Sequence, residues 1–199
     1  MNIVCLDLEG VLTPEIWIAF SEASGIPELR RTTREEPDYD KLMRWRIGLL
    51  KDRGLTLADI RRVIGTIDPL PGAKSFLDAL RALVPTVILS DTFAEFAAPL
   101  MEKLGQPLLL CNSLDVDENG LITAHRMRIK NSKLTTVRAF HSIGYDTLAV
   151  GDSFNDIDMI RASKAGFLFR TSDTVRQAHP DLPAYEDYDA LLAAIRTAL

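Results

Sequence analysis

Several short apolar segments, none of which alternates with polar residues, constrain the fold of this chain more than any other feature. They span residues 3–6, 86–89, 108–111, 147–150 and 166–169. Segments of this kind are typical of strands buried on both faces, as in a parallel sheet covered by helices. Amphipathic helical patterns separate them, in residues 73–83, 93–104 and 134–143. The alternation predicts an α/β fold with a doubly wound, Rossmann-like parallel sheet and right-handed crossovers.

One long segment interrupts this alternation. Residues 14–70 show only helical patterns, most clearly in 40–50 and 57–64, and Thr56 with Asp59 three positions later is typical of a helix N-terminus. We therefore expect an inserted helical cap domain at 14–70, and an α/β core formed by 1–13 and 71–199.

A second, shorter segment also departs from the pattern. Residues 112–129 contain Asp117-Glu118-Asn119-Gly120 between two runs that mix polar and apolar residues. An Asn-Gly pair in that position is a strong hairpin signal, so we expect a β-hairpin here.

Composition excludes some classes of function. The formal net charge is −5, which argues against nucleic acid as the main partner because phosphate backbones attract lysine and arginine patches. Cys5 and Cys111 each lie in an apolar run, which favours reduced, buried thiols. No apolar stretch has the length of a membrane span and no leader pattern precedes the first strand, so we expect a cytoplasmic protein without a membrane partner. The sequence leaves monomer and homodimer open.

Polar residues follow three of the apolar segments at the point where each ends. Asp7 follows the first, Ser90 and Asp91 follow the second, and Asp152 follows the fourth. A single acidic residue there is also typical of a turn cap. Because open α/β sheets bind ligands at the carboxyl ends of their strands, three such coincidences indicate a functional site at one edge of the sheet.

These residues together resemble the motifs of the haloacid dehalogenase superfamily of phosphotransferases. Asp7-Leu8-Glu9 is similar to its first motif, Ser90 to its second, and Lys133 at a helix start to its third. Residues 151–156, Gly-Asp-Ser-Phe-Asn-Asp, are similar to its fourth. The four motifs occur in order and extend over essentially the whole chain.

The resemblance implies phosphoryl transfer through a covalent aspartyl phosphate. Asp7 would be the nucleophile, and Glu9 would protonate the leaving oxygen and later deprotonate the attacking water. Mg²⁺ would be held by Asp7, Asp152 and the backbone carbonyl of Glu9, since hard cations prefer oxygen ligands.

The resemblance also implies which residues contact the phosphate. Ser90 and Lys133 would bind its oxygens, Asn155 would meet the substrate phosphate, and Asp156 would support the metal site. Asn155 and Asp156 are equally typical of a helix cap and turn. Lys130 is a rival for Lys133, and either lysine is also compatible with a solvated surface position. We favour Lys133 because Asn131-Ser132 looks like a helix start.

A helical insert directly after the first motif is the arrangement found in phosphoserine phosphatases. In that family a glutamate and a cap arginine recognise the ammonium and carboxylate of the substrate, and the matching residues here are Glu15 and Arg46. Glu15 is also compatible with an ordinary acidic residue in a helix first turn, and Arg46 with a surface arginine.

Two positions depart from typical phosphoserine phosphatases, which carry Asp in place of Glu9 and often Gly in place of Asp91. Both departures match a bacterial branch of bifunctional phosphoserine phosphatases and homoserine phosphotransferases, so Asp91 is predicted among the substrate-binding residues and homoserine as a possible acceptor. The stretches shared with that branch are Asp-Leu-Glu-Gly-Val-Leu, Pro-Glu-Ile-Trp-Ile-Ala-Phe and Val-Ile-Leu-Ser-Asp-Thr-Phe.

Two other functions remain open. The same core could act on another small phosphomonoester, such as a sugar phosphate or a nucleotide. It could also be a non-catalytic binding domain, although the nucleophile, the acid, the serine, the lysine and the metal-binding aspartate are all present.

Overall fold

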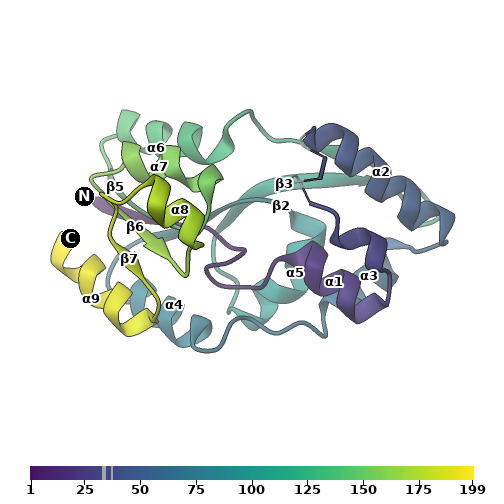
Figure 1. The fold of residues 1–199 in the computed structure, drawn as a ribbon, viewed down its shortest axis with the longest axis horizontal. Helices are drawn as coiled ribbons and strands as arrows, with labels where there is room; N and C mark the ends of the chain where they lie inside the picture. Colours follow the sequence, from purple (N-terminus) through teal and green to yellow (C-terminus); the bar gives the residue numbers. More distant parts are fainter. Residues whose placement is uncertain (33–34, 37) are drawn as a thin grey trace.

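The computed structural model describes residues 1–32, 35–36 and 38–199. Within this part of the chain one mixed sheet has the strand order β4-β3-β2-β1-β5-β6-β7 (Figure 1). All neighbouring strands pair in parallel except β3 and β4, which pair antiparallel. The strands are β1 (Asn2–Leu6), β2 (Thr86–Phe93), β3 (Leu109–Val116), β4 (Ile122–Arg126), β5 (Asp146–Gly151), β6 (Ala165–Phe169) and β7 (Ala184–Tyr185). The predicted doubly wound α/β class is confirmed.

Helices cover both faces of this sheet. Figure 1 shows α6, α7 and α8 on one side and α4 and α9 on the other. Alternate side chains of β1 point to opposite faces of the sheet. Val4 and Leu6 therefore pack in the same apolar cluster as residues of α4 and α9, and Ile3 and Cys5 pack in the cluster that contains residues of α6 and α7. These helices, with α5 beside β2 and β3, are α4 (Ala73–Arg81), α5 (Ala94–Lys103), α6 (Ser132–Ser142), α7 (Ile157–Ala162), α8 (Asp173–Ala178) and α9 (Tyr188–Ala198).

Two strands run further than the sequence pattern predicts. Strand β2 continues past residue 89, so Ser90 and Asp91 lie inside it, at an irregularity in its pairing with β3 between Leu89 and Phe93. Strand β3 continues past residue 111 to Val116, because its outer half is also the first strand of the hairpin. Both extensions contain polar residues, so the apolar pattern in the sequence did not predict these strand ends.

The segment between β1 and α4 is helical, as predicted. It contains α1 (Ile16–Ser24), a 3₁₀ turn η1 (Pro27–Arg30), α2 (Tyr39–Asp52) and α3 (Leu57–Ile64), which gather at one end of the molecule (Figure 1). Helix α3 has the predicted bounds, and Thr56 and Asp59 form a reciprocal capping box at its start. That residues 14–70 form a separate domain stays a prediction, and Thr33, Arg34 and Pro37 lie outside the described residues.

The predicted hairpin is present and contacts this helical segment. The turn is held by Asp117, whose Oδ1 accepts hydrogen bonds of 2.9 Å from the backbone N–H groups of Asn119 and Leu121. The tip reaches α3, where the N–H of Leu57 donates to the carbonyl of Gly120 at 2.7 Å. Among the described residues, every helix is too short or too polar to span a lipid bilayer.

Candidate active site

Asp7 lies directly after the central strand β1, at the carboxyl edge of the sheet. Its backbone N–H still pairs with the carbonyl of Val150 at 2.9 Å, which fixes the residue between β1 and β5. The side chain is buried, and its Oδ1 accepts a 2.7 Å hydrogen bond from the N–H of Leu8. Strand order therefore places this carboxylate in the middle of the ligand-binding edge.

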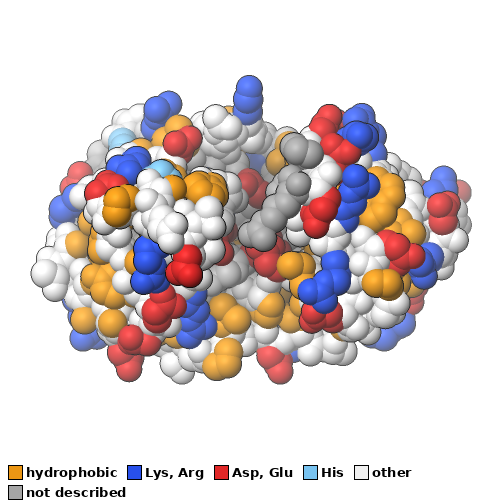
Figure 2. Space-filling view, viewed as in Figure 1, with side chains coloured by type: hydrophobic (Ala, Val, Ile, Leu, Met, Phe, Trp, Pro, Cys, Tyr) orange, Lys and Arg blue, Asp and Glu red, His pale blue; other side chains and the backbone are white. Residues whose placement is uncertain are grey.

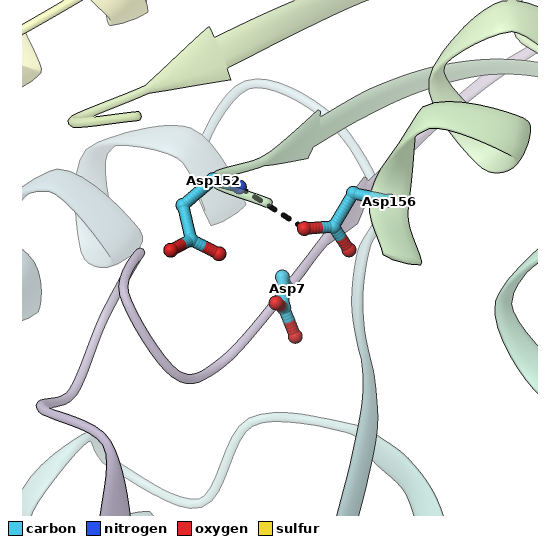
Figure 3. A group of neighbouring side chains, drawn as sticks. All are labelled: Asp7, Asp152 and Asp156. Carbon is cyan, nitrogen blue, oxygen red and sulfur yellow. Dashed lines mark hydrogen bonds between the residues drawn. The ribbon is translucent and has the colours of Figure 1, made fainter. Parts of the chain in front are cut away.

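Asp152 and Asp156 converge on Asp7 from the loop and 3₁₀ turn after β5 (Figure 3). The three residues each offer a carboxylate oxygen within 4.8 Å of the others. Burial, followed by the charge of Asp156, raises the pKa of Asp7 well above its usual range and that of Asp152 to about 6. The cluster thus concentrates negative charge in a site with little water, which favours binding of a cation.

Lys133 is the cation that this cluster already contains. Its Nζ lies 2.9 Å from Oδ1 of Asp7 and 2.6 Å from Oδ1 of Asp156, and the side chain is buried. Burial alone would lower the pKa of Lys133, but Asp7 and Asp156 raise it above its usual range. Lys133 lies in the first turn of α6, as predicted, whereas Lys130 is exposed. The surface-cation interpretation of Lys133 is wrong.

Asp156 organises the loop that carries Asp152. Its Oδ2 accepts hydrogen bonds from the N–H groups of Asp152 (3.0 Å, dashed in Figure 3) and Ser153 (3.1 Å), and its Oδ1 binds Lys133. This bonding includes the helix-cap role that the sequence left open, and adds a direct link to the lysine.

The acidic cluster fits a hard divalent cation. Carboxylate oxygens are the ligands that Mg²⁺ prefers, and Asp7 and Asp152 come from two neighbouring strand ends. Both oxygens of Asp156 already accept hydrogen bonds, so Asp7 and Asp152 are the better placed ligands. The third predicted ligand, the carbonyl of Glu9, belongs to the turn that follows Asp7.

Gly10 allows that turn to pass against Asp152. Its φ is +78°, a left-handed conformation, and a Cβ built on it would lie 2.3 Å from Oδ2 of Asp152. The glycine directly after the first motif is therefore required by the close approach of the backbone to an acidic side chain of the fourth motif.

Glu9 lies in a turn: β1 ends at Leu6, and the chain turns at residues 8–12. Its Oε1 accepts a 2.7 Å hydrogen bond from the N–H of Ile16, the first residue of α1. Burial, and then the charge of Glu15, raises the pKa of Glu9 to about 7. Glu15 itself is the residue just before α1 rather than a first-turn residue, and it is exposed.

Ser90 and Asp91 extend the site along β2. Ser90 is buried, and its Oγ accepts from the N–H of Thr92 at 3.2 Å. Asp91 receives hydrogen bonds on both carboxylate oxygens, from Oγ of Ser132 at 2.9 Å and from Nδ2 of Asn155 at 3.4 Å. Asp91 thus links β2 to the start of α6 and to the turn that carries Asn155.

A family model for haloacid dehalogenase-like hydrolases matches residues 1–164, which include all four motifs. The chain belongs to this family.

Two curated relatives are similar to this hydrolase over most of its length. A phosphoserine phosphatase of Pseudomonas syringae pv. tomato is 50% identical, covering 96% of this chain and 81% of the relative. The phosphoserine phosphatase ThrH of Pseudomonas aeruginosa is 49% identical, covering 96% of this chain and 93% of the relative.

Solved structures share the fold at lower identity. A phospho-aspartyl intermediate analogue of phosphoserine phosphatase has a TM-score of 0.77 and 21% identity, covering 96% of this chain and 97% of that chain. The phosphoserine phosphatase from T. onnurineus has a TM-score of 0.73 and 22% identity, covering 98% and 94%. These likenesses support the α/β architecture of the hydrolase.

Arg46 is a buried residue of this hydrolase, so the surface-arginine interpretation is wrong. It lies on α2 with 4% of its surface exposed, and its guanidinium stacks on Trp17 with Cζ 4.3 Å from the ring centroid. Nη2 donates to the carbonyl of Arg31 at 2.7 Å. The buried Nε has no hydrogen-bond partner among the described residues. Burial lowers the pKa of Arg46 to about 10, and the nearby Glu9 and Glu15 partly oppose this.

A cavity of about 540 Å³ opens beside the predicted site residues of the hydrolase. Its polar wall includes Asp91, Lys133 and Asn155, and its apolar wall includes Phe154. Tyr39 also lines it, and sequence reasoning missed this residue. The available signal was its position seven residues before Arg46, which places both on one face of α2. Figure 2 shows acidic side chains in the recess between the α1–α3 end of the molecule and the end with α6 to α9.

Proposed function

We propose that this hydrolase is a phosphoserine phosphatase that uses Asp7 as its nucleophile. The observation that carries the proposal is the contact between the buried Asp7 carboxylate and Nζ of Lys133 at 2.9 Å, beside Asp152. A lysine in that place neutralises phosphate oxygens while the carboxylate attacks phosphorus. The names of the two relatives near 50% identity support phosphoserine as the substrate.

The proposed reaction has two steps. First, an oxygen of Asp7 bonds to phosphorus, the bond from phosphorus to the serine oxygen breaks, and Glu9 gives its proton to that oxygen. Then Glu9 takes a proton from water, the water oxygen bonds to phosphorus, and the bond from phosphorus to the Asp7 oxygen breaks, which frees phosphate and restores the Asp7 carboxylate. A pKa of about 7 suits Glu9 to both proton transfers near neutral pH.

Mg²⁺ would be held by Asp7, Asp152 and the carbonyl of Glu9. When bound, the ion would supply positive charge to the phosphate oxygens. Ser90 and Asn155 would contact the remaining phosphate oxygens, and Asp156 would hold Lys133 and the Asp152 loop in place.

Glu15 and Arg46 would select the amino acid part of the substrate. Both charges act on the pKa of Glu9, which Glu15 raises and Arg46 lowers. Arg46 is buried with an unpaired Nε–H, a donor that a substrate carboxylate would satisfy. A glutamate and an arginine are the complement of an ammonium and a carboxylate.

We further propose homoserine as an acceptor that competes with water. In the second step Glu9 would take the proton of the homoserine hydroxyl, and the product would be phosphohomoserine instead of free phosphate. Glu9 and Asp91, the two departures from typical phosphoserine phosphatases, support this branch. The expected compartment is the cytoplasm.

The test is phosphate release from O-phosphoserine with and without Mg²⁺ and with and without homoserine. The proposal expects Mg²⁺-dependent release, a higher kcat/KM than for a sugar phosphate or a nucleotide, and phosphohomoserine when homoserine is present. A higher kcat/KM for a sugar phosphate or a nucleotide would make that compound the proposed substrate instead of phosphoserine. If no phosphomonoester releases phosphate, the non-catalytic binding domain is favoured. If phosphoserine releases phosphate but no phosphohomoserine forms, the enzyme only hydrolyses phosphoserine.

A further inference from the structure

Tyr39 brings a hydroxyl from the helical segment to the cavity of the active site. It is the first residue of α2, whose start is fixed by Asp38, because Oδ1 of Asp38 accepts a 3.0 Å hydrogen bond from the N–H of Lys41. Its side chain lines the same cavity as Asp91 and Lys133. A residue of α2 and residues of the sheet edge thus face one space.

The hairpin holds the ring of Tyr39 in place. Tyr39 packs edge-to-face against His125 of β4, with centroids 6.3 Å apart and planes at 87°. His125 in turn lies 2.8 Å from Oδ1 of Asp40 and packs edge-to-face on the buried Phe93 at 6.3 Å. The side chain of His125 is only 8% exposed. The position of the Tyr39 ring is therefore set before any ligand binds.

Tyr39 and Arg46 both belong to α2 and project from the same side of that helix. The two residues are two helical turns apart on one face of α2, and each shifts the pKa of the other. The charge of Glu9 raises the pKa of both residues, and the charge of Asp91 raises that of Tyr39. Burial, and then the charge of Glu9, raises the pKa of Tyr39 above its usual range, so the phenol is a neutral donor near pH 7.

An anionic ligand group at this place needs more than one donor. Asp91 lines the cavity and repels a carboxylate, and Arg46 already uses Nη2 on the carbonyl of Arg31. The Nε–H of Arg46 is buried and has no partner among residues 1–32, 35–36 and 38–199. A phenol on the same face of α2 adds a hydrogen bond without adding another charge that would need its own partner.

We propose that Tyr39 is a specificity-determining residue whose hydroxyl, together with Arg46, binds the carboxylate of an amino acid phosphate. This inference rests on the proposed function, since it concerns how phosphoserine is distinguished from other phosphomonoesters.

The test compares O-phosphoserine with O-phosphoethanolamine, which differs only in lacking the carboxylate. The measured quantity is the ratio of kcat/KM for the two substrates, in the wild type and in Tyr39→Phe. We expect the ratio to fall about tenfold in Tyr39→Phe, through KM for phosphoserine, because a hydrogen bond to a charged group is lost while the ring contact with His125 is kept. The control is Tyr145→Phe, which removes a hydroxyl from a ring that packs on Phe140 instead, and it should keep the wild-type ratio.

The outcomes separate this inference from the proposed function. A wild type that does not prefer phosphoserine over phosphoethanolamine overturns the proposed function as well as the role of Tyr39. A wild type with that preference, but an unchanged ratio in Tyr39→Phe, overturns only the role of Tyr39. Equal losses on both substrates would assign the hydroxyl to the phosphate or to the leaving oxygen, and would likewise overturn the carboxylate contact. Inhibition constants for serine and for ethanolamine give an independent measure. In Tyr39→Phe, inhibition by serine should weaken and inhibition by ethanolamine should stay unchanged.

Discussion

The N–H of Ile16 donates a 2.7 Å hydrogen bond to Oε1 of Glu9, across the turn that joins the sheet to α1. Ile16 is the first residue of that helix, and the first N–H groups of a helix have no partner within it. The acid expected to carry the proton therefore also holds the start of the helical segment. This contact gives a structural reason for Glu at this position, since an Asp carboxylate stands one methylene closer to its own backbone.

Glu9→Asp should weaken this contact and change the choice of phosphoryl acceptor. Loss of a helix N-terminal hydrogen bond costs about 0.5–2 kcal/mol of unfolding free energy. The shorter arm should also alter the ratio of phosphohomoserine to free phosphate formed from phosphoserine at a fixed homoserine concentration. Glu9→Gln is the matched variant, because its amide oxygen can still accept from Ile16 while no proton can be exchanged, so it should keep stability and lose turnover. Unchanged partitioning in Glu9→Asp would move acceptor choice to other residues.

Asp7→Asn should abolish turnover and leave the fold intact. The change removes the nucleophile but keeps an acceptor for the N–H of Leu8, and it relieves repulsion from Asp156. Steady-state rates with phosphoserine and thermal unfolding together check this. Activity within about tenfold of wild type, a barrier change of only about 1.4 kcal/mol, would contradict covalent catalysis by Asp7.

Asp152→Ala should raise the Mg²⁺ concentration required for half-maximal activity, or abolish activity, because a carboxylate ligand is lost. Metal titrations that superimpose on those of the wild type would rule out Asp152 as a ligand.

Gly10→Ala should act in the same direction as Asp152→Ala, because its Cβ would lie 2.3 Å from Oδ2 of Asp152 and displace that side chain. Gly25→Ala is a matched control: its φ of +68° imposes similar backbone strain, but a Cβ there meets nothing within 4 Å. Backbone strain should cost each variant about 1 kcal/mol of unfolding free energy, and Gly10→Ala should lose more because its Cβ also displaces Asp152. Only Gly10→Ala should shift the Mg²⁺ titration. Equal titrations for the two variants would contradict the displacement of Asp152 by a Cβ at position 10.

Lys133→Met should destabilise the protein strongly as well as inactivate it. The buried carboxylates of Asp7 and Asp156 would lose their cationic partner, and breaking a buried ion pair from one side costs about 3–5 kcal/mol. Lys130→Met, at an exposed position three residues earlier, should change unfolding free energy little. Chemical denaturation of both variants measures the difference. A Lys133→Met protein as stable as Lys130→Met would show that the buried contacts contribute nothing net.

Local patterns in the sequence were enough for the architecture. Runs of apolar residues predicted the parallel strands, because strands buried on both faces cannot alternate. The Thr56–Asp59 capping box and the Asn119-Gly120 turn were predicted because their partners lie within a few residues of one another. Asp7 and Asp152 were placed at one edge because parallel strands end on the same side of a sheet.

The contacts that tune the site were decided by tertiary structure. Nothing near Arg46 in the sequence indicates that it is buried against Trp17, and nothing near Tyr39 indicates that His125, from the distant hairpin, holds its ring. Glu9 reaches Ile16 only because the chain turns after β1 instead of staying extended. Periodicity reports which face of an element is apolar. Partners supplied by other elements depend on packing between segments far apart in the chain, and only the folded chain brings them together.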